Sequence, residues 1–200
     1  MNILAIDTCT EVASVTLYSS NVKTTRVLTD IAKSSGYILK LCDEVFKEAG
    51  NNLQEIDFIS YTKGPGAFTG VRMCVGVVQG LSLSCSIPTL GFSTLELLAF
   101  RASKILKKDK IATAIDARMG EVYWAVYDNG SISNMRICKP ENVDNLGASF
   151  VGVGSGWKVH NDELIKASQI NHTDSNIYPE STNLIDLSLL AIESGQKATF

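Results

Sequence analysis

Two aspartates stand where a protein could hold a magnesium ion and the phosphates of a nucleotide. Asp7 follows an apolar run at residues 2–6, Asp116 follows a similar run at residues 111–115, and each precedes a polar turn and a second apolar run. Phosphate loops of this kind usually place glycine close behind the aspartate, so that bare backbone can approach the phosphate, and this chain has other residues there. We interpret both turns as degenerate nucleotide loops, and Asx turns are the alternative. The positions concerned are Asp7, Thr8, Thr10, Asp116 and Arg118.

The glycine-rich loop at residues 64–70 is a second candidate for phosphate binding. Glycines that open a helix expose backbone amides and the positive end of the helix dipole. A P-loop, however, needs Lys and then Ser or Thr directly after its last glycine, whereas Val71 and Arg72 follow Gly70 here. We therefore expect a tight turn into a helix, with Thr69 as its N-cap.

Metal catalysis and nucleophilic catalysis lack the residue sets that they need. The two histidines, His160 and His172, are twelve positions apart, and neither belongs to a known ligand pattern. The five cysteines are odd in number and scattered, without Cys-x-x-Cys spacing, which is typical of reduced core residues. No serine or cysteine has an identifiable base. We expect no metal site and no catalytic nucleophile.

The composition is typical of a soluble globular protein. The chain has 200 residues, of which 45% are hydrophobic and 20% charged, and its net charge is -3. A negative net charge argues against a broad basic face that binds nucleic acid unaided. Because no apolar run reaches the roughly 18 residues of a membrane span, and a strand begins at once, we expect a cytoplasmic protein with no membrane contact.

Two predicted helices beside these loops carry more apolar surface than one contact requires. The first begins at Ser34 or Ser35 and ends at Gly50, and the second follows residues 64–70 and has Arg72 as its only charge. Either both are core helices, or they share their apolar faces with a partner chain. The residues assigned to the partner interface are Tyr37, Leu41, Val45, Val71, Arg72, Val75 and Val78.

The two halves of the chain follow one pattern. Residues 3–18 and 111–127 each contain an apolar strand, Ala-Ile-Asp, a polar turn, Glu-Val and a second apolar strand. This predicts an internal duplication and two α/β lobes, at residues 1–103 and 104–200. The second lobe is predicted to be poor in helices. Its pattern predicts a polar connection at residues 129–145, a weak strand near residues 177–178 and a last helix at residues 181–194.

Four segments, in this order and spacing, resemble the TsaB (YeaZ) family over most of the chain. They are Ile-Asp-Thr-x-Thr at residues 6–10, Gly-Pro-Gly-Ala-Phe-Thr-Gly-Val-Arg at residues 64–72, Gln-Gly-Leu at residues 79–81 and Asp-Ala-Arg-x-Gly-Glu-Val-Tyr-Trp-Ala at residues 116–125. The resemblance implies an actin-like, two-lobed fold of the acetate kinase, Hsp70 and hexokinase superfamily, with a shortened second lobe.

The resemblance also implies a role in making threonylcarbamoyladenosine beside the anticodon of tRNA. Proteins of this family are not thought to be the catalyst: they pair with the paralogue TsaD, which carries the metal, the ATPase TsaE joins them, and they form homodimers when alone. The metal-binding histidines of TsaD correspond to Thr94 and Leu98 in this sequence, which cannot replace them. The chain is therefore expected to bind no cofactor itself, beyond a weakly held adenine nucleotide at the interface of the complex, and to reach tRNA only through the complex.

Two other functions remain as alternatives. A small ATP-dependent phosphotransferase would use Asp7 and Asp116, and micromolar binding of Mg-ATP would support it. A glycopeptidase of the M22 type would need a bound metal in stoichiometric amount.

Overall fold

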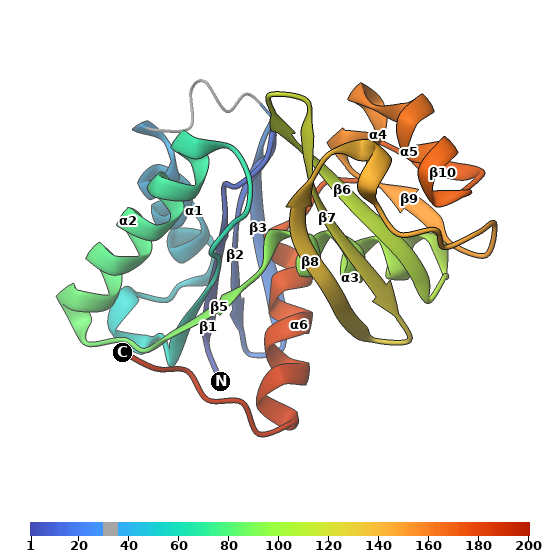
Figure 1. The fold of residues 1–200 in the computed structure, drawn as a ribbon. Helices are drawn as coiled ribbons and strands as arrows, with labels where there is room; N and C mark the ends of the chain where they lie inside the picture. Colours follow the sequence, from blue (N-terminus) through green and yellow to red (C-terminus); the bar gives the residue numbers. More distant parts are fainter. Residues whose placement is uncertain (30–35) are drawn as a thin grey trace. The chain divides into compact units, whose positions relative to one another are not determined.

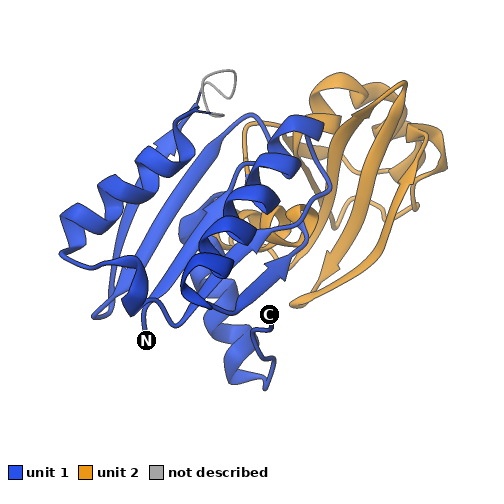
Figure 2. Cartoon of the chain, turned by 90° about the vertical axis from the view of Figure 1, so that its left-hand side faces the viewer, with its two compact units in different colours: residues 1–93, 179–200 blue, residues 94–178 orange. Residues whose placement is uncertain are grey.

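The structure, a computed structural model, describes residues 1–29 and 36–200. Its contacts form two compact units (Figure 2). Unit 1 contains Met1–Ser93 and Pro179–Phe200, and unit 2 contains Thr94–Tyr178. Each unit is built on one five-stranded mixed sheet (Figure 1).

The sheet of unit 1 has the strand order β3-β2-β1-β4-β5. Its strands are β1 (Ile3–Asp7), β2 (Ala13–Ser19), β3 (Val22–Leu28), β4 (Phe58–Thr62) and β5 (Thr89–Phe92). β1, β2 and β3 form an antiparallel meander, and β4 and β5 run parallel to β1 on its other side. The predicted hairpin with an aspartate at its tip is therefore confirmed.

Helices cover both faces of this sheet. Leu4, Ile6 and Val15 share one face and form a buried core with α1 (Ile38–Ala49) and α2 (Phe68–Cys85). The alternate residues face α6 (Ser181–Glu193), which packs on β1, β2 and β4. Small polar groups make this second contact: the hydroxyls of Thr16 and Ser181 lie 2.7 Å apart, and those of Ser188 and Ser60 lie 2.6 Å apart.

The sheet of unit 2 has the order β10-β9-β6-β7-β8, which repeats the topology of the first sheet. β6 (Lys110–Arg118), β7 (Glu121–Asp128) and β8 (Ser131–Cys138) are the antiparallel meander, and β9 (Val151–Val153) and β10 (His172–Asp174) are parallel to β6. The helices of unit 2 are α3 (Thr94–Leu106), α4 (Ser155–Val159) and α5 (Asn161–Ser168), and short 3-10 turns lie at Leu53–Glu55 in unit 1 and Pro140–Asn142 in unit 2.

The unit boundaries differ from the predicted division at residues 103 and 104. α3 follows the last strand of the first sheet but packs on β6 and β7, where Leu95, Leu98 and Ala102 join the core of unit 2. α6 follows the last strand of the second sheet but packs in unit 1. The third helix of each repeat thus belongs to the other unit, because its apolar face fits the core there.

Three local predictions are wrong. The polar connection at residues 129–145 contains β8, in which Ser, Asn and Arg stand among the apolar residues Ile132, Met135 and Ile137. The weak strand near residues 177–178 lies instead at His172–Asp174. The N-cap of α2 is Ala67, without a side-chain hydrogen bond, and not Thr69.

Candidate functional site

Asp7, at the end of β1, is fully buried in unit 1. Its Oδ1 accepts hydrogen bonds from the Thr62 hydroxyl at 2.5 Å and from the Cys9 backbone N–H at 3.2 Å. Its Oδ2 is buried without a hydrogen-bond partner, as is the hydroxyl of Thr10. Burial raises the pKa of Asp7 to about 6, because water no longer solvates the charged form. Thr62, which the sequence analysis did not single out, is the residue that orients this carboxylate.

The glycine-rich loop packs directly on the turn that follows β1. The backbone N–H of Ala67 donates to the Cys9 carbonyl at 2.8 Å, and the Thr8 hydroxyl donates to the Gly70 carbonyl at 2.6 Å. A Cβ atom at Gly66 would lie 2.0 Å from the Cys9 carbonyl oxygen, and one at Gly70 would lie 2.1 Å from the Thr8 carbonyl oxygen. These two glycines therefore permit a close approach of the chain's own backbone.

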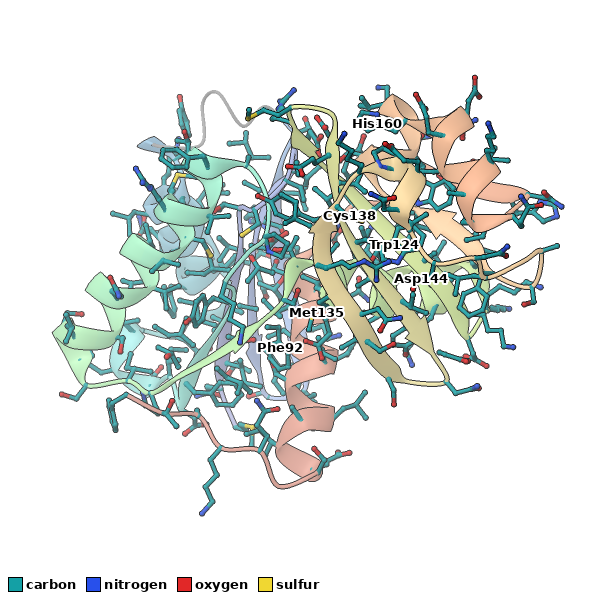
Figure 3. The ribbon with its side chains drawn as sticks, in the orientation of Figure 1. Phe92, Trp124, Met135, Cys138, Asp144 and His160 are labelled. Carbon is teal, nitrogen blue, oxygen red and sulfur yellow. The ribbon has the colours of Figure 1, made fainter. Side chains whose placement is uncertain are left out.

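Asp116 occupies the matching position in unit 2, near the end of β6 and opposite Val122 of β7. Its Oδ1 accepts a hydrogen bond from the Arg118 backbone N–H at 3.1 Å, and its own N–H donates to the Ser155 hydroxyl at 3.2 Å. The His160 Nε2 lies 3.7 Å from Asp116 Oδ1, and the Arg118 side chain is 88% exposed. Figure 3 labels His160 on the segment between α4 and α5.

Both aspartates therefore make the Asx turn that the sequence left open, since each accepts the backbone N–H two residues ahead. In unit 1 the space beside the turn is filled by the loop at residues 64–70. Within residues 1–29 and 36–200, no group of three His, Cys, Asp or Glu side chains could hold a metal ion. Thr94 and Leu98 are both buried, at 0% and 1% exposure.

An exposed and largely apolar feature of unit 1 is the outer α2 face, which we define as Phe68, Arg72, Gly76, Gly80 and Leu83. These residues recur every three or four positions and so lie on one side of the helix. Phe68 is 69% exposed and Leu83 is 82% exposed, and a Cβ at Gly76 or Gly80 would meet nothing within 4 Å. The Arg72 guanidinium stacks over the Phe68 ring at 3.6 Å.

The opposite side of α2 packs on the sheet. Only Gly70, Cys74 and Val78 of this 18-residue helix are buried. α2 is thus a surface helix with an apolar outer side, and the alternative of a core helix is wrong.

The residues of the predicted partner interface differ in how far they are exposed. Leu41, Val45 and Val78 are 8%, 0% and 2% exposed and belong to the core of unit 1, so they cannot form a contact surface. Val71 and Val75 are half-buried. Two residues of the set are accessible to solvent: Arg72, and Tyr37, which is the N-cap of α1 and is 45% exposed. Ser34 and Ser35, the predicted start of that helix, lie outside the described residues.

By length and composition α2 is also apolar enough to cross a membrane, with 17% of it buried. A single helix of this kind is weak support for a membrane span, because the core helix of a soluble protein passes the same test of length and composition. α2 packs on β4 and β1 and is continuous with the loop that contacts the β1–β2 turn.

Comparison with known proteins identifies relatives. Residues 31–196 match the family described as TsaD, tRNA N6-adenosine threonylcarbamoyltransferase. The tRNA threonylcarbamoyladenosine biosynthesis protein TsaB of Escherichia coli (strain K12) is 32% identical over 98% of this chain and 89% of that protein. YeaZ from Pseudomonas aeruginosa is similar in structure, with a TM-score of 0.89 and 31% identity over 100% of this chain and 97% of that chain.

A more remote likeness concerns the fold alone. Component A of the Acidaminococcus fermentans (R)-2-hydroxyglutaryl-CoA dehydratase has a TM-score of 0.50 at 10% identity, covering 92% of this chain and 94% of that chain.

Proposed function

The chain belongs to the TsaB (YeaZ) family, with its two-lobed actin-like α/β fold, and from this premise we propose that it is a non-catalytic subunit that binds TsaD. Its relatives are named tRNA threonylcarbamoyladenosine biosynthesis proteins, and this chain acts in the biosynthesis of the same modified nucleoside of tRNA. TsaD transfers the threonylcarbamoyl group, and the present chain holds TsaD in an active form. TsaE joins the pair, tRNA is bound by the complex, and the site of action is the cytoplasm.

The observation that carries this proposal is the outer α2 face. A helix with exposed Phe68 and Leu83 loses free energy in water, because apolar surface is left uncovered. Gly76 and Gly80 serve no packing role inside the unit, since a Cβ at either would meet open space. Glycine costs an exposed helix about 1 kcal/mol relative to alanine, so a partner helix that approaches closely explains both residues.

The two aspartate turns support the non-catalytic part of the proposal. In unit 1 the carbonyl oxygens of Thr8 and Cys9 face Gly70 and Gly66, so a phosphate would have to displace the loop and meet two negative dipoles. In unit 2 the residue two positions after Asp116 is the long, exposed Arg118 instead of glycine. The first turn is thus covered by the chain's own loop, and the second lacks the glycine directly behind its aspartate that phosphate loops usually have.

The test changes the outer α2 face while leaving the core of unit 1 intact. The variant carries Leu83→Asp and Gly76→Lys, both at exposed positions of α2. The matched control is Ile105→Asp, which changes a 53% exposed apolar residue on α3. Size-exclusion chromatography with light scattering is measured for each protein alone and with TsaD of the same genome, and threonylcarbamoyladenosine formation is measured with TsaD, TsaE, tRNA and the threonylcarbamoyl donor.

We expect the wild-type chain and the control to form a heterodimer with TsaD and to support modification equally. The α2 variant should bind TsaD at least about 100-fold more weakly, because hot-spot residues each contribute about 2 kcal/mol or more. Any homodimer of the free chain that uses the same face should dissociate in parallel. Unchanged binding of TsaD by the folded α2 variant would contradict the proposed surface.

A further inference from the structure

Unit 1 holds two cysteine thiols in its core that the proposed function does not use. Cys9 lies in the turn after β1 and Cys74 on the buried side of α2, and both are 0% exposed. The Cys9 thiol donates to the Thr62 carbonyl at 3.5 Å, and the Cys74 thiol donates to the Ile6 carbonyl at 3.5 Å. The Cys9–Cys74 thiol pair therefore lies where the β1–β2 turn, the end of β4 and α2 meet.

The two thiols are also within hydrogen-bonding reach of each other, and this contact is the main cause that raises the pKa of Cys74. Both sulfurs also contact Thr62: the Cys9 sulfur lies 3.5 Å from its carbonyl oxygen and the Cys74 sulfur 4.0 Å from its hydroxyl oxygen. A disulfide has a sulfur–sulfur distance of about 2.05 Å, and side-chain rotation beside Thr62 would bring the two sulfurs together. No change in the strand register is needed.

The segments that carry the pair are already held together. The hydrogen bond from Ala67 N–H to the Cys9 carbonyl and the contact of Gly70 with the Thr8 carbonyl join the start of α2 to the β1–β2 turn on both sides of the thiols. Bond formation therefore requires little further ordering of the backbone. Cys42, the third buried cysteine of this unit, lies on α1, and burial is the main cause that raises its pKa.

We propose that Cys9 and Cys74 are a redox-modification site and form a reversible disulfide that links the β1–β2 turn to α2. The oxidant class is a hydroperoxide, which is small enough to enter during a local opening of the loop. The bond closes a long loop of chain, so it restricts the unfolded state and stabilises unit 1.

The chemistry balances with hydrogen peroxide alone. One thiolate attacks a peroxide oxygen, becoming a sulfenic acid and releasing hydroxide. The second thiolate attacks the sulfenic sulfur, so the sulfur–sulfur bond forms and a second hydroxide leaves. The two thiol protons convert both hydroxides to water, and a dithiol reductant reverses the oxidation by exchange. Because both thiols are buried, the rate follows the opening of the loop.

The test is peptide mapping of the full chain carrying Cys85→Ser, which removes the second cysteine from the tryptic peptide of Cys74. The reduced protein is treated with hydrogen peroxide, residual thiols are blocked with iodoacetamide, and tryptic peptides are analysed without reduction. We expect residues 1–23 linked to residues 73–101, lighter by two hydrogen atoms than the separate peptides. The link should disappear with dithiothreitol, and the oxidised protein should show a higher Tm.

Two results would overturn the proposal. One is oxidation of the partly exposed Cys138 while residues 1–23 and 73–101 remain unlinked. The other is a link that forms only at urea concentrations that abolish the far-UV circular dichroism of the fold. The variant Cys74→Ser serves as the negative control, because it cannot form the link. If this variant does not fold, the peptide map of the Cys85→Ser protein alone shows whether residues 1–23 and 73–101 are linked.

A consequence for the partner contact rests on the proposed function. α2 carries both Cys74 and the outer α2 face, so the linked protein should differ from the reduced protein in its affinity for TsaD. The peptide map involves no partner, so a missing link and a missing TsaD contact are separate outcomes.

Discussion

At the scale of single residues, the unfavourable environment of Asp7 is the most informative feature. A carboxylate with no solvent exposure and one oxygen without a partner destabilises the folded state whenever it is charged. The Thr62 hydroxyl and the Cys9 N–H reduce this cost but do not remove it, since the pKa stays raised. Asp7 thus organises the turn at the expense of stability near neutral pH.

The pH dependence of stability should reflect Asp7. Its pKa is about 6 in the folded state and near 3.8 when unfolded, so the folded state holds the proton more tightly. Its contribution to stability is therefore greatest below about pH 4, declines as pH rises towards 6, and is lost above that, by roughly 3 kcal/mol at most. Urea unfolding at pH 4.5 and 7.5 should show Asp7→Asn gaining on the wild type as pH rises.

The control for this comparison is Asp109→Asn, which changes an exposed carboxylate. Equal changes of the unfolding free energy with pH in both variants would mean that Asp7 is not the group responsible.

Two glycines of α2 should respond in opposite directions to alanine. Gly70→Ala places a methyl group 2.1 Å from the Thr8 carbonyl oxygen and should cost about 1–3 kcal/mol or more. Gly76→Ala enters open space on an exposed helix and should stabilise the monomer by about 0.5–1 kcal/mol. Urea midpoints of the two variants measure this, and a Gly70→Ala protein as stable as the wild type would refute the close approach.

At the scale of elements, the two helical layers of unit 1 use different chemistry. α1 and α2 contribute apolar side chains to one face of the sheet, including Ile38 and Cys74. α6 meets the other face through hydroxyl groups, and the Ser188 hydroxyl lies within hydrogen-bonding distance of both the Ser60 hydroxyl (2.6 Å) and the Leu184 carbonyl (2.7 Å). Small polar residues let α6 lie close to the sheet, so its position depends on specific hydrogen bonds as well as on buried area.

Removing one of these buried hydroxyls should therefore lower the free energy of unfolding, even though a serine side chain is small. Ser188→Ala leaves the Ser60 hydroxyl buried without this hydrogen-bond partner, and we expect a loss of about 1–2 kcal/mol. Ser194→Ala, at the exposed C-cap of the same helix, should stay within about 0.5 kcal/mol of the wild type. Chemical denaturation measures both, and equal losses would show that the contact of α6 with the sheet is not specific.

At the scale of the whole molecule, two sheets of the same topology and the exchanged third helices make up the duplicated fold, and in unit 1 the chain's own backbone closes over the turn after β1. The loop at residues 64–70 covers the turn after β1, through Gly66 and Gly70. The loop therefore occupies the space beside the β1–β2 turn, where the Thr8 and Cys9 carbonyls meet it.

The free chain should accordingly not bind Mg-ATP tightly. Isothermal titration of the purified protein with Mg-ATP is expected to give only the heat of dilution at micromolar protein concentration. Micromolar binding that Asp7→Ala removes would instead support the ATP-dependent phosphotransferase. A titration in the presence of TsaD measures any nucleotide that needs the complex.

The sequence by itself was sufficient for features that local pattern encodes. The strand–turn–strand repeat around Asp7 and Asp116 predicted the duplication, and the end of α1 at Gly50 was predicted from the left-handed backbone that glycine adopts there. The glycine-rich motif and the Asp-Ala-Arg segment predicted the family. Each of these signals depends on neighbours in the chain, so no tertiary contact is needed to recognise it.

Only the tertiary structure decided which faces are buried and which unit each helix joins. Val45, Val78 and Leu83 are equally apolar in the sequence, yet the sheet covers the first two and leaves Leu83 82% exposed. α3 and α6 are exchanged between the units because burial of their faces depends on strands far away in the chain. The roles of Gly66 and Gly70 likewise follow from carbonyl groups about 60 residues distant, which no local pattern reveals.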